Sequence, residues 1–280
     1  MIRKVLIPLD GSPLAHVIIP CIQPLLVPMG AEVLLVSNGK HTEIGLRQHY
    51  LAQVAAELCP LPVTTQLLDG AVAESISAAA DQWGADLIAM STHGRTGVAR
   101  AMLGSVADRV LHLAQQPVFL ARTGVRAPCA LNQLLVPLDG SPLAETVLPY
   151  AYALAKHTGA TLTLLLVLEE IDTGEWGEIV GNGPLAGSWK ADITAAAQHY
   201  LDGVKARFAD VACITRLIPG QAAEAILLAA DEEKSDLLLM NTHGRAGYQR
   251  WRHGSVASQV LHEANVPLFL THGSLLGLQK

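Results

Sequence analysis

Aromatic and charged residues are scarce in this sequence of 280 residues. Phe, Trp and Tyr make up 4% of it and charged residues 16%, whereas 50% of the residues are hydrophobic. The low charge excludes a disordered polyelectrolyte, and the apolar content favours strands that are buried on both faces. At about one to two hundred residues per domain, the length predicts two domains.

An excess of basic residues is also lacking. Lys and Arg number 19 against 25 Asp and Glu, which gives a net charge of −6. A nucleic-acid surface needs a stripe of cations, so nucleic acid is not an expected partner. The four cysteines form no C-x-x-C pair and the histidines show no H-E-x-x-H spacing. We therefore expect no metal site and no disulfide framework, and read the cysteines as reduced cytoplasmic thiols.

No apolar run is long enough to cross a membrane. The most apolar stretch, residues 17–35, is interrupted by Pro20, Pro24 and Pro28, whereas a span needs about 20 largely apolar residues. The first apolar run, residues 5–9, is too short for the core of a secretory signal. We expect a soluble, cytoplasmic protein without a membrane partner. The absence of a P-loop and of a G-x-S-x-G motif excludes the usual P-loop ATPases and serine hydrolases.

The sequence contains a long internal repeat. Residues 7–15 return as residues 136–144, at an offset of 129, with eight of nine positions identical. Residues 86–122 align without gaps to residues 236–272, at an offset of 150, with 20 of 37 positions identical. One unit has been duplicated, and the second copy carries 21 extra residues between its second strand and its next helix. We predict two domains, at residues 1–124 and 131–280.

Short apolar runs alternate with helical stretches in each unit, which implies βαβ crossovers and a parallel sheet. The expected strands are residues 5–9, 33–36, 63–68, 87–90 and 118–121, and in the second unit residues 134–138, 162–168, 212–218, 237–240 and 268–271. The expected helices of the first unit are residues 13–27, 43–58, 72–83 and 105–113. The fold class predicted is α/β, with two repeated doubly wound domains, each a five-stranded parallel sheet with helices on both faces.

The first crossover helix conflicts with its own sequence. Pro20, Pro24 and Pro28 recur inside it at intervals of four, and a proline in a regular helix interior costs about 3 kcal/mol. We expect this helix to be kinked or to end early.

Candidate binding residues follow the first and fourth strands of each unit, because ligands of open parallel sheets collect at the carboxyl ends of the strands. Asp10 follows the first strand, and a glycine-containing loop joins the fourth strand to a helix that begins at Ser105. Glycines let bare amides approach a phosphate, and a helix start adds unpaired N–H groups. An equally plain interpretation is that the glycine and the serine only end a strand and cap a helix.

These motifs resemble the universal stress protein family in its tandem form. The resemblance rests on Pro-x-Asp-Gly-Ser after the first strand, on the Thr-His-Gly-Arg turn and on the Gly-x9-Gly-Ser loop, and it covers both units. It implies an adenine-nucleotide alpha-hydrolase-like fold with an ATP site, in which the aspartate and a backbone group at the end of strand two hold the adenosine. The glycine loop would hold the phosphates. The residues carried over are Pro8, Asp10, Gly94, Gly104, Ser105, Val106, Pro137, Asp139, Val167, Gly244, Gly254, Ser255 and Val256.

Two departures from the family pattern distinguish the units. The first glycine of the loop is replaced by Ser91 in the first unit and by Asn241 in the second. The usual His-Val at the end of strand two is Ser37-Asn38 in the first unit and Leu166-Val167 in the second. The phosphate loop is therefore nearer the pattern in unit one, and the adenine wall is nearer the pattern in unit two.

Three functions compete at this point. The first is a nucleotide-binding stress or regulatory protein, with ATP, or else ADP or AMP, as a ligand in one or both domains, no catalytic residue and an unidentified protein partner. The second is a slow ATPase or phosphotransferase in which Asp10 or Asp139 helps to hold Mg²⁺, and we expect any turnover to be far below about 1 per second. The third is a nucleotide-free interaction module. We also expect the two near-identical units to form an internal pseudo-dimer, and the family resemblance implies that they meet at their fifth strands. A further homodimer stays open.

Overall fold

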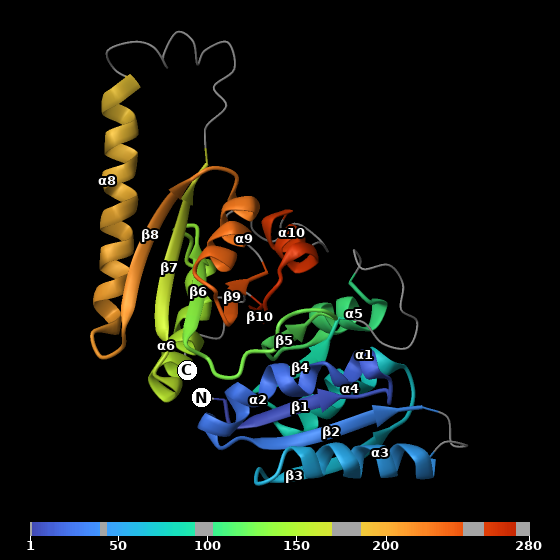
Figure 1. Cartoon of the computed structure of the whole chain (residues 1–280). Coiled ribbons are helices and arrows are strands. Elements are labelled where there is room, and N and C mark those ends of the chain that lie inside the picture. Colours follow the sequence, from blue (N-terminus) through green and yellow to red (C-terminus); the bar gives the residue numbers. More distant parts are fainter. Residues whose placement is uncertain (1, 40–43, 93–102, 170–185, 243–254, 273–280) are drawn as a thin grey trace.

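A computed structural model describes residues 2–39, 44–92, 103–169, 186–242 and 255–272, with the side chains of residues 186–190 left aside. Its ten strands form one continuous sheet, in the order β3-β2-β1-β4-β5-β10-β9-β6-β7-β8 (Figure 1). Each half contributes five neighbouring strands in the same order, which is the structural form of the sequence repeat.

The two halves are built from corresponding elements. In the first half these are β1 (Lys4–Pro8), α1 (Pro13–His16), α2 (Ile18–Met29), β2 (Glu32–Asn38), α3 (Ile44–Glu57), β3 (Val63–Leu68), α4 (Val72–Trp83), β4 (Leu87–Ser91), α5 (Ser105–Leu113) and β5 (Val118–Ala121). In the second half they are β6 (Gln133–Leu138), η2 (Ala144–Val147), α6 (Leu148–Thr158), β7 (Thr161–Leu168), α8 (Ala186–Lys205), η3 (Ala206–Phe208), β8 (Cys213–Pro219), α9 (Ala222–Glu232), β9 (Leu237–Asn241), α10 (Ser255–Glu263) and β10 (Leu268–Thr271).

The predicted fold class is confirmed. All strand pairs within a half are parallel, and the central strands are buried on both faces. One apolar layer packs the sheet against α1, α2, α3, α6 and α8, and the other packs it against α4, α5, α9 and α10. Among the described residues, no helix is long and apolar enough to span a membrane.

The halves join edge to edge through their fifth strands, as the family resemblance predicts. β5 and β10 pair in antiparallel fashion, with Phe119 opposite its own counterpart Phe269. The flanking pairs, Leu268 with Leu120 and Leu270 with Val118, are related by the same exchange of halves. Such self-complementary pairing is that of a local two-fold axis. It also covers two strand edges that would otherwise be open to aggregation.

The antiparallel junction has a consequence for the two candidate sites. All strands of one half run in the same direction, and all strands of the other half run in the opposite direction. The carboxyl ends of β1 and β4 therefore lie at one edge of the ten-stranded sheet, and those of β6 and β9 lie at the other (Figure 1). Each half therefore has a carboxyl edge of its own, where the candidate residues of that half lie.

Of the two outcomes expected for the first crossover helix, a kink or an early end, the early end is wrong. The helix breaks at Val17, but α2 then continues through Pro24 and Pro28 to Met29 and ends at Gly30, whose φ is 57°. Pro20 lies in the first turn of α2, where a backbone N–H has no intrahelical partner. The three prolines lie outside the buried face of the helix. The isoleucines and leucines of α2 form that face and pack in the core. Apolar burial thus outweighs the hydrogen bonds that the prolines remove.

Candidate functional site

The aspartate after the first strand of each half organises the turn that follows it. Asp10 Oδ1 accepts a hydrogen bond from the Ser12 amide at 2.8 Å, and Ser12 Oγ accepts one from the Ala15 amide at 3.1 Å. Asp139 and Ser141 repeat this arrangement at 2.9 and 3.2 Å. These hydrogen bonds hold each half-buried carboxylate at the carboxyl edge of its half.

The loop after β4 returns to the point where it leaves the sheet. The Thr92 amide donates to the Ala121 carbonyl at 2.9 Å, and the Gly104 amide donates to the Thr92 carbonyl at 2.8 Å. Gly104 caps α5 with extended backbone angles and without a side-chain hydrogen bond. Ser105 is the exposed first residue of the helix rather than its cap. The beginning of α5 therefore presents backbone amides beside the end of β4.

The other carried-over residues divide into four groups. Pro8 and Pro137 belong to β1 and β6 and are half-buried. Three apolar positions are half-buried against the core layer of α4, α5, α9 and α10: Val106, Val167 and Val256. Ser255 is exposed at the start of α10. Three glycines lie outside the described residues: Gly94, Gly244 and Gly254.

A buried arginine, which the sequence analysis missed, lies at the end of β2. Arg47 of α3 is 9% exposed, and its Nη1 donates to Ser37 Oγ at 3.0 Å and to the Asn38 carbonyl. A side chain at Gly39 would overlap the Arg47 guanidinium, because a Cβ there would lie 1.9 Å from Arg47 Cζ. The second half has Ala197 in place of the arginine and apolar residues at the end of β7.

The side chain of Asn38 reaches the segment that follows the neighbouring strand β3. Its Nδ2 donates to the Gly70 carbonyl at 3.1 Å and to Ser75 Oγ at 2.9 Å. The polar residue that replaces the family's valine here is thus satisfied within the first half. The end of β2 is a hydrogen-bonded polar wall, whereas the end of β7 is apolar.

A tyrosine cluster stands close to the aspartate in each half, and the sequence analysis missed it too. Tyr50 Oη lies 3.3 Å from His16 Nδ1, and His16 Nε2 lies 3.1 Å from Glu57 Oε2. Burial, together with the negative charges of Asp10 and Glu57, raises the pKa of Tyr50 to about 12. The tyrosine is therefore a neutral hydroxyl beside the carboxylate of Asp10.

The corresponding cluster of the second half exchanges the charges. Tyr200 Oη donates to Glu145 Oε1 at 3.1 Å, and Arg207 Nη1 donates to Glu145 Oε2 at 2.6 Å. Burial, Glu145 and Asp139 all raise the pKa of Tyr200. Glutamate has replaced the histidine, and arginine has replaced the glutamate, so the carboxylate and its nitrogen-bearing partner have exchanged positions.

Asn241 is tied down at the end of β9. Its Nδ2 donates to Thr146 Oγ1 at 2.7 Å and to Thr271 Oγ1 at 3.2 Å. Thr146 Oγ1 also donates to the Leu143 carbonyl at 2.7 Å. Asn241 and Thr271 are 6% and 3% exposed. The amide therefore bridges the end of the fourth strand of this half to the first crossover and to the fifth strand.

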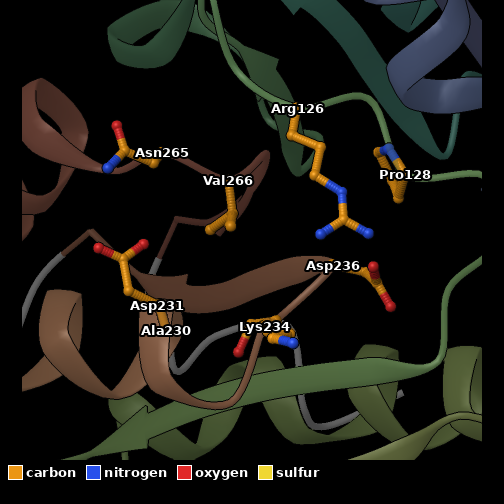
Figure 2. A pocket seen from close by; sticks show the side chains of 9 residues that line it. Arg126, Pro128, Ala230, Asp231, Lys234, Asp236, Asn265 and Val266 are labelled. Atoms are coloured by element: carbon orange, nitrogen blue, oxygen red, sulfur yellow. The ribbon is translucent and has the colours of Figure 1, made fainter.

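A separate cavity lies at the opposite, amino edge of the second half (Figure 2). It measures about 180 Å³ and is lined by the linker residues Arg126 and Pro128 together with the end of α9 and the beginnings of β9 and β10. Ligand sites of ordinary size run to about 300–1,000 Å³, so this cavity is too small for a nucleotide. Its Ser235 hydroxyl is buried and has no hydrogen-bond partner among the described residues.

The fold and these residues define a tandem α/β protein with candidate ligand-binding residues at the carboxyl edge of each half of a continuous sheet. The model of the universal stress protein family matches residues 24–122 and 131–272. The chain belongs to the universal stress protein family.

Related proteins agree with this assignment. A universal stress protein of Mycolicibacterium smegmatis is 27% identical over 83% of this chain and 76% of its own length. Universal stress protein Mb2028c of Mycobacterium bovis is also 27% identical, and the match spans 68% of this chain and 63% of that protein. Universal stress protein MJ0531 of Methanocaldococcus jannaschii is 42% identical over 50% of this chain and 81% of its own length.

Solved structures show the same fold. A putative universal stress protein of Pseudomonas aeruginosa UCBPP-PA14 matches 97% of this chain and 93% of its own, with a TM-score of 0.74 and 18% identity. One from Archaeoglobus fulgidus DSM 4304 matches 96% of this chain and 98% of its own, with a TM-score of 0.70 and 20% identity. A universal stress protein in complex with cAMP matches only 44% of this chain, with a TM-score of 0.38, a likeness too partial to bear on the site.

Proposed function

We propose that this chain is a regulatory protein that binds an adenine nucleotide, with ATP as the expected ligand and ADP or AMP as alternatives. The observation that carries the proposal is the position of α5. The hydrogen bond between Gly104 and Thr92 brings the start of α5 back to the end of β4, and β4 is the direct neighbour of β1. Helix-start amides and the Asp10 carboxylate therefore share one edge of the first half.

The residues present fit the chemistry of a nucleotide. The start of α5 has no side-chain cap, so its amides and the positive end of the helix dipole are suited to phosphate oxygens. Ser105 is exposed and adds a hydroxyl donor. Asp10 is an acceptor suited to a ribose hydroxyl, or to Mg²⁺ if the nucleotide is bound with its metal.

Nucleotide binding can regulate without chemistry. A ligand shifts a protein between conformations by as much as its affinities for them differ. The start of α5, the turn after β1 and the end of β2 belong to three separate segments of the first half, so a nucleotide that contacts all three would favour one arrangement of this edge. We infer that a protein partner binds preferentially to that arrangement.

Nucleotide released from the denatured, purified protein and identified by mass spectrometry tests the proposal. Calorimetric titration with ATP then compares Gly104→Val with the matched control Gly203→Val, since Gly203 lies on α8 with open space around its Cβ position. We expect Gly104→Val to weaken binding more than tenfold because its side chain occupies the phosphate approach. Absence of released nucleotide together with absence of ATP binding would refute the proposed function.

A further inference from the structure

The Asn241 network distinguishes the two candidate sites. Buried Asn241 and Thr271 and half-buried Thr146 form a polar trio that hydrogen-bonds within itself. The repeat offsets of 129 and 150 identify the corresponding residues of the first half as Val17, Ser91 and Ala121. Two of these three residues are apolar. The trio of the second half is therefore a set of linked replacements rather than a single change.

The trio connects the walls between which a ligand would enter. Thr146 lies on η2, directly after the turn that Asp139 organises, and Asn241 is the last residue of β9. Their hydrogen bond ties the segment after the first strand of this half to the point where the fourth-strand loop begins. In the first half the position of Thr146 is held by Val17, whose side chain cannot accept such a bond.

Opening the second site to a ligand would cost free energy that opening the first site would not. Moving the Asn241 amide aside breaks its hydrogen bonds to the Thr146 and Thr271 hydroxyls, and a buried amide that loses its partners is strongly unfavourable. Ser91 is shorter than asparagine by the whole amide group, so it leaves more room for a ligand to reach the backbone at the end of β4.

The polar end of β2 does not offset this difference. Arg47 donates to the Asn38 carbonyl, but a carbonyl oxygen has two lone pairs and can accept a second hydrogen bond. The side chain of Asn38 is directed to Gly70 and Ser75, and so is held away from its own backbone.

We propose that the two halves have diverged so that only the first half binds the nucleotide, while the Asn241–Thr146–Thr271 trio locks the second half closed. This inference rests on the proposed function. One chain then binds one nucleotide, and the second half serves as the scaffold that completes the sheet.

Calorimetric titration of the full chain with ATP tests the lock by its stoichiometry. We expect one ATP per wild-type chain and two per chain of the double variant Asn241→Ser with Thr146→Val, which gives the second half the residues of the first. The reciprocal variant, Ser91→Asn with Val17→Thr, should lose at least tenfold in affinity. Circular dichroism and urea unfolding verify that each variant is folded.

The outcomes separate the two proposals. Two ATP per wild-type chain would leave the proposed function intact and overturn the lock, as would a folded double variant that still binds one ATP beside a reciprocal variant of unchanged affinity. No binding by the wild-type chain would overturn both. The single variants Asn241→Ser and Thr146→Val show which member of the trio is responsible.

Discussion

The carboxyl edges of the two halves differ far more than their cores do. Each half has the same strand order and the same crossovers, yet the first half brings together His16, Tyr50 and Glu57 where the second brings together Glu145, Tyr200 and Arg207. Each replacement comes with a compensating one, so every cluster stays internally hydrogen-bonded. Duplication has kept the scaffold, and linked groups of edge residues have changed around it.

Equivalent substitutions in the two halves should have the most similar effects at the junction between the halves. Phe119 and Phe269 pair across it and are both fully buried. Phe119→Ala and Phe269→Ala should each lower the free energy of unfolding by about 3–5 kcal/mol. The second should cost up to about 1 kcal/mol more, because Tyr150 packs on Phe269 with ring centroids 5.3 Å apart, whereas Cys21 holds the corresponding position in the first half. Urea unfolding measures both, and a cost below about 1 kcal/mol for either contradicts the central role of the pair.

The hydrogen bonds of the two tyrosines should contribute differently to the free energy of unfolding. Tyr200 donates to a carboxylate and Tyr50 contacts an imidazole. Hydrogen bonds to charged groups contribute about 1.5–3 kcal/mol and neutral ones about 0.5–1.5 kcal/mol. Tyr200→Phe should therefore destabilise the protein more than Tyr50→Phe at neutral pH, as measured by urea unfolding. Equal costs would show that the exchange of charges has no energetic consequence.

The same clusters predict an effect that is confined to alkaline pH. The folded state raises the pKa of Tyr50 to about 12, whereas an unfolded tyrosine titrates near 10. The folded state thus holds the proton more tightly, so this stabilisation is complete below about pH 10 and is lost as the pH rises toward 12. Tyr50→Phe should make the stability decline less steeply between about pH 10 and 12. An unchanged pH profile would exclude Tyr50 as a source of the decline.

The smallest predicted effect concerns Ser235. Its hydroxyl is buried without a partner among the described residues, and the first half has Ala85 at the corresponding position. Ser235→Ala should leave stability unchanged or raise it by up to about 1 kcal/mol, and Ala85→Ser should lower it, because only the serine buries an unsatisfied group. Thermal unfolding of the two variants checks the opposite signs. A loss on Ser235→Ala would mean that the hydroxyl is satisfied by bound water.

Much of the fold follows from local sequence patterns. The strands Val63–Leu68 and Val118–Ala121 and the helix Val72–Trp83 have the predicted bounds, because short apolar runs and clear helical periodicity define them. The family resemblance, and no local pattern, predicts the pairing of the fifth strands. The course of α2 could not be predicted in the same way, since tertiary burial decides whether a helix continues through Pro24 and Pro28.

The site was only partly accessible to sequence reasoning. Asp10 and Gly104 stand in a recognisable motif, and the structure places both at the carboxyl edge of the first half. The hydrogen-bond partners of Arg47, Tyr50 and Asn241 could not be predicted, because no local pattern specifies a side-chain partner. Asn241, for example, hydrogen-bonds to Thr146, which lies 95 positions away in the chain. Comparison of the two units offered one signal, since the asparagine at 241 and the threonine at 146 both replace less polar residues.

Hydrogen exchange measured by mass spectrometry, with and without saturating ATP, tests most directly that one half carries the nucleotide. Ser105–Leu113 and Ser255–Glu263 are equivalent helices of nine residues, so each serves as the reference for the other. The account predicts that ATP slows exchange in the first turn of α5 and leaves α10 unchanged. Equal slowing in both helices, or slowing in α10 alone, would contradict it.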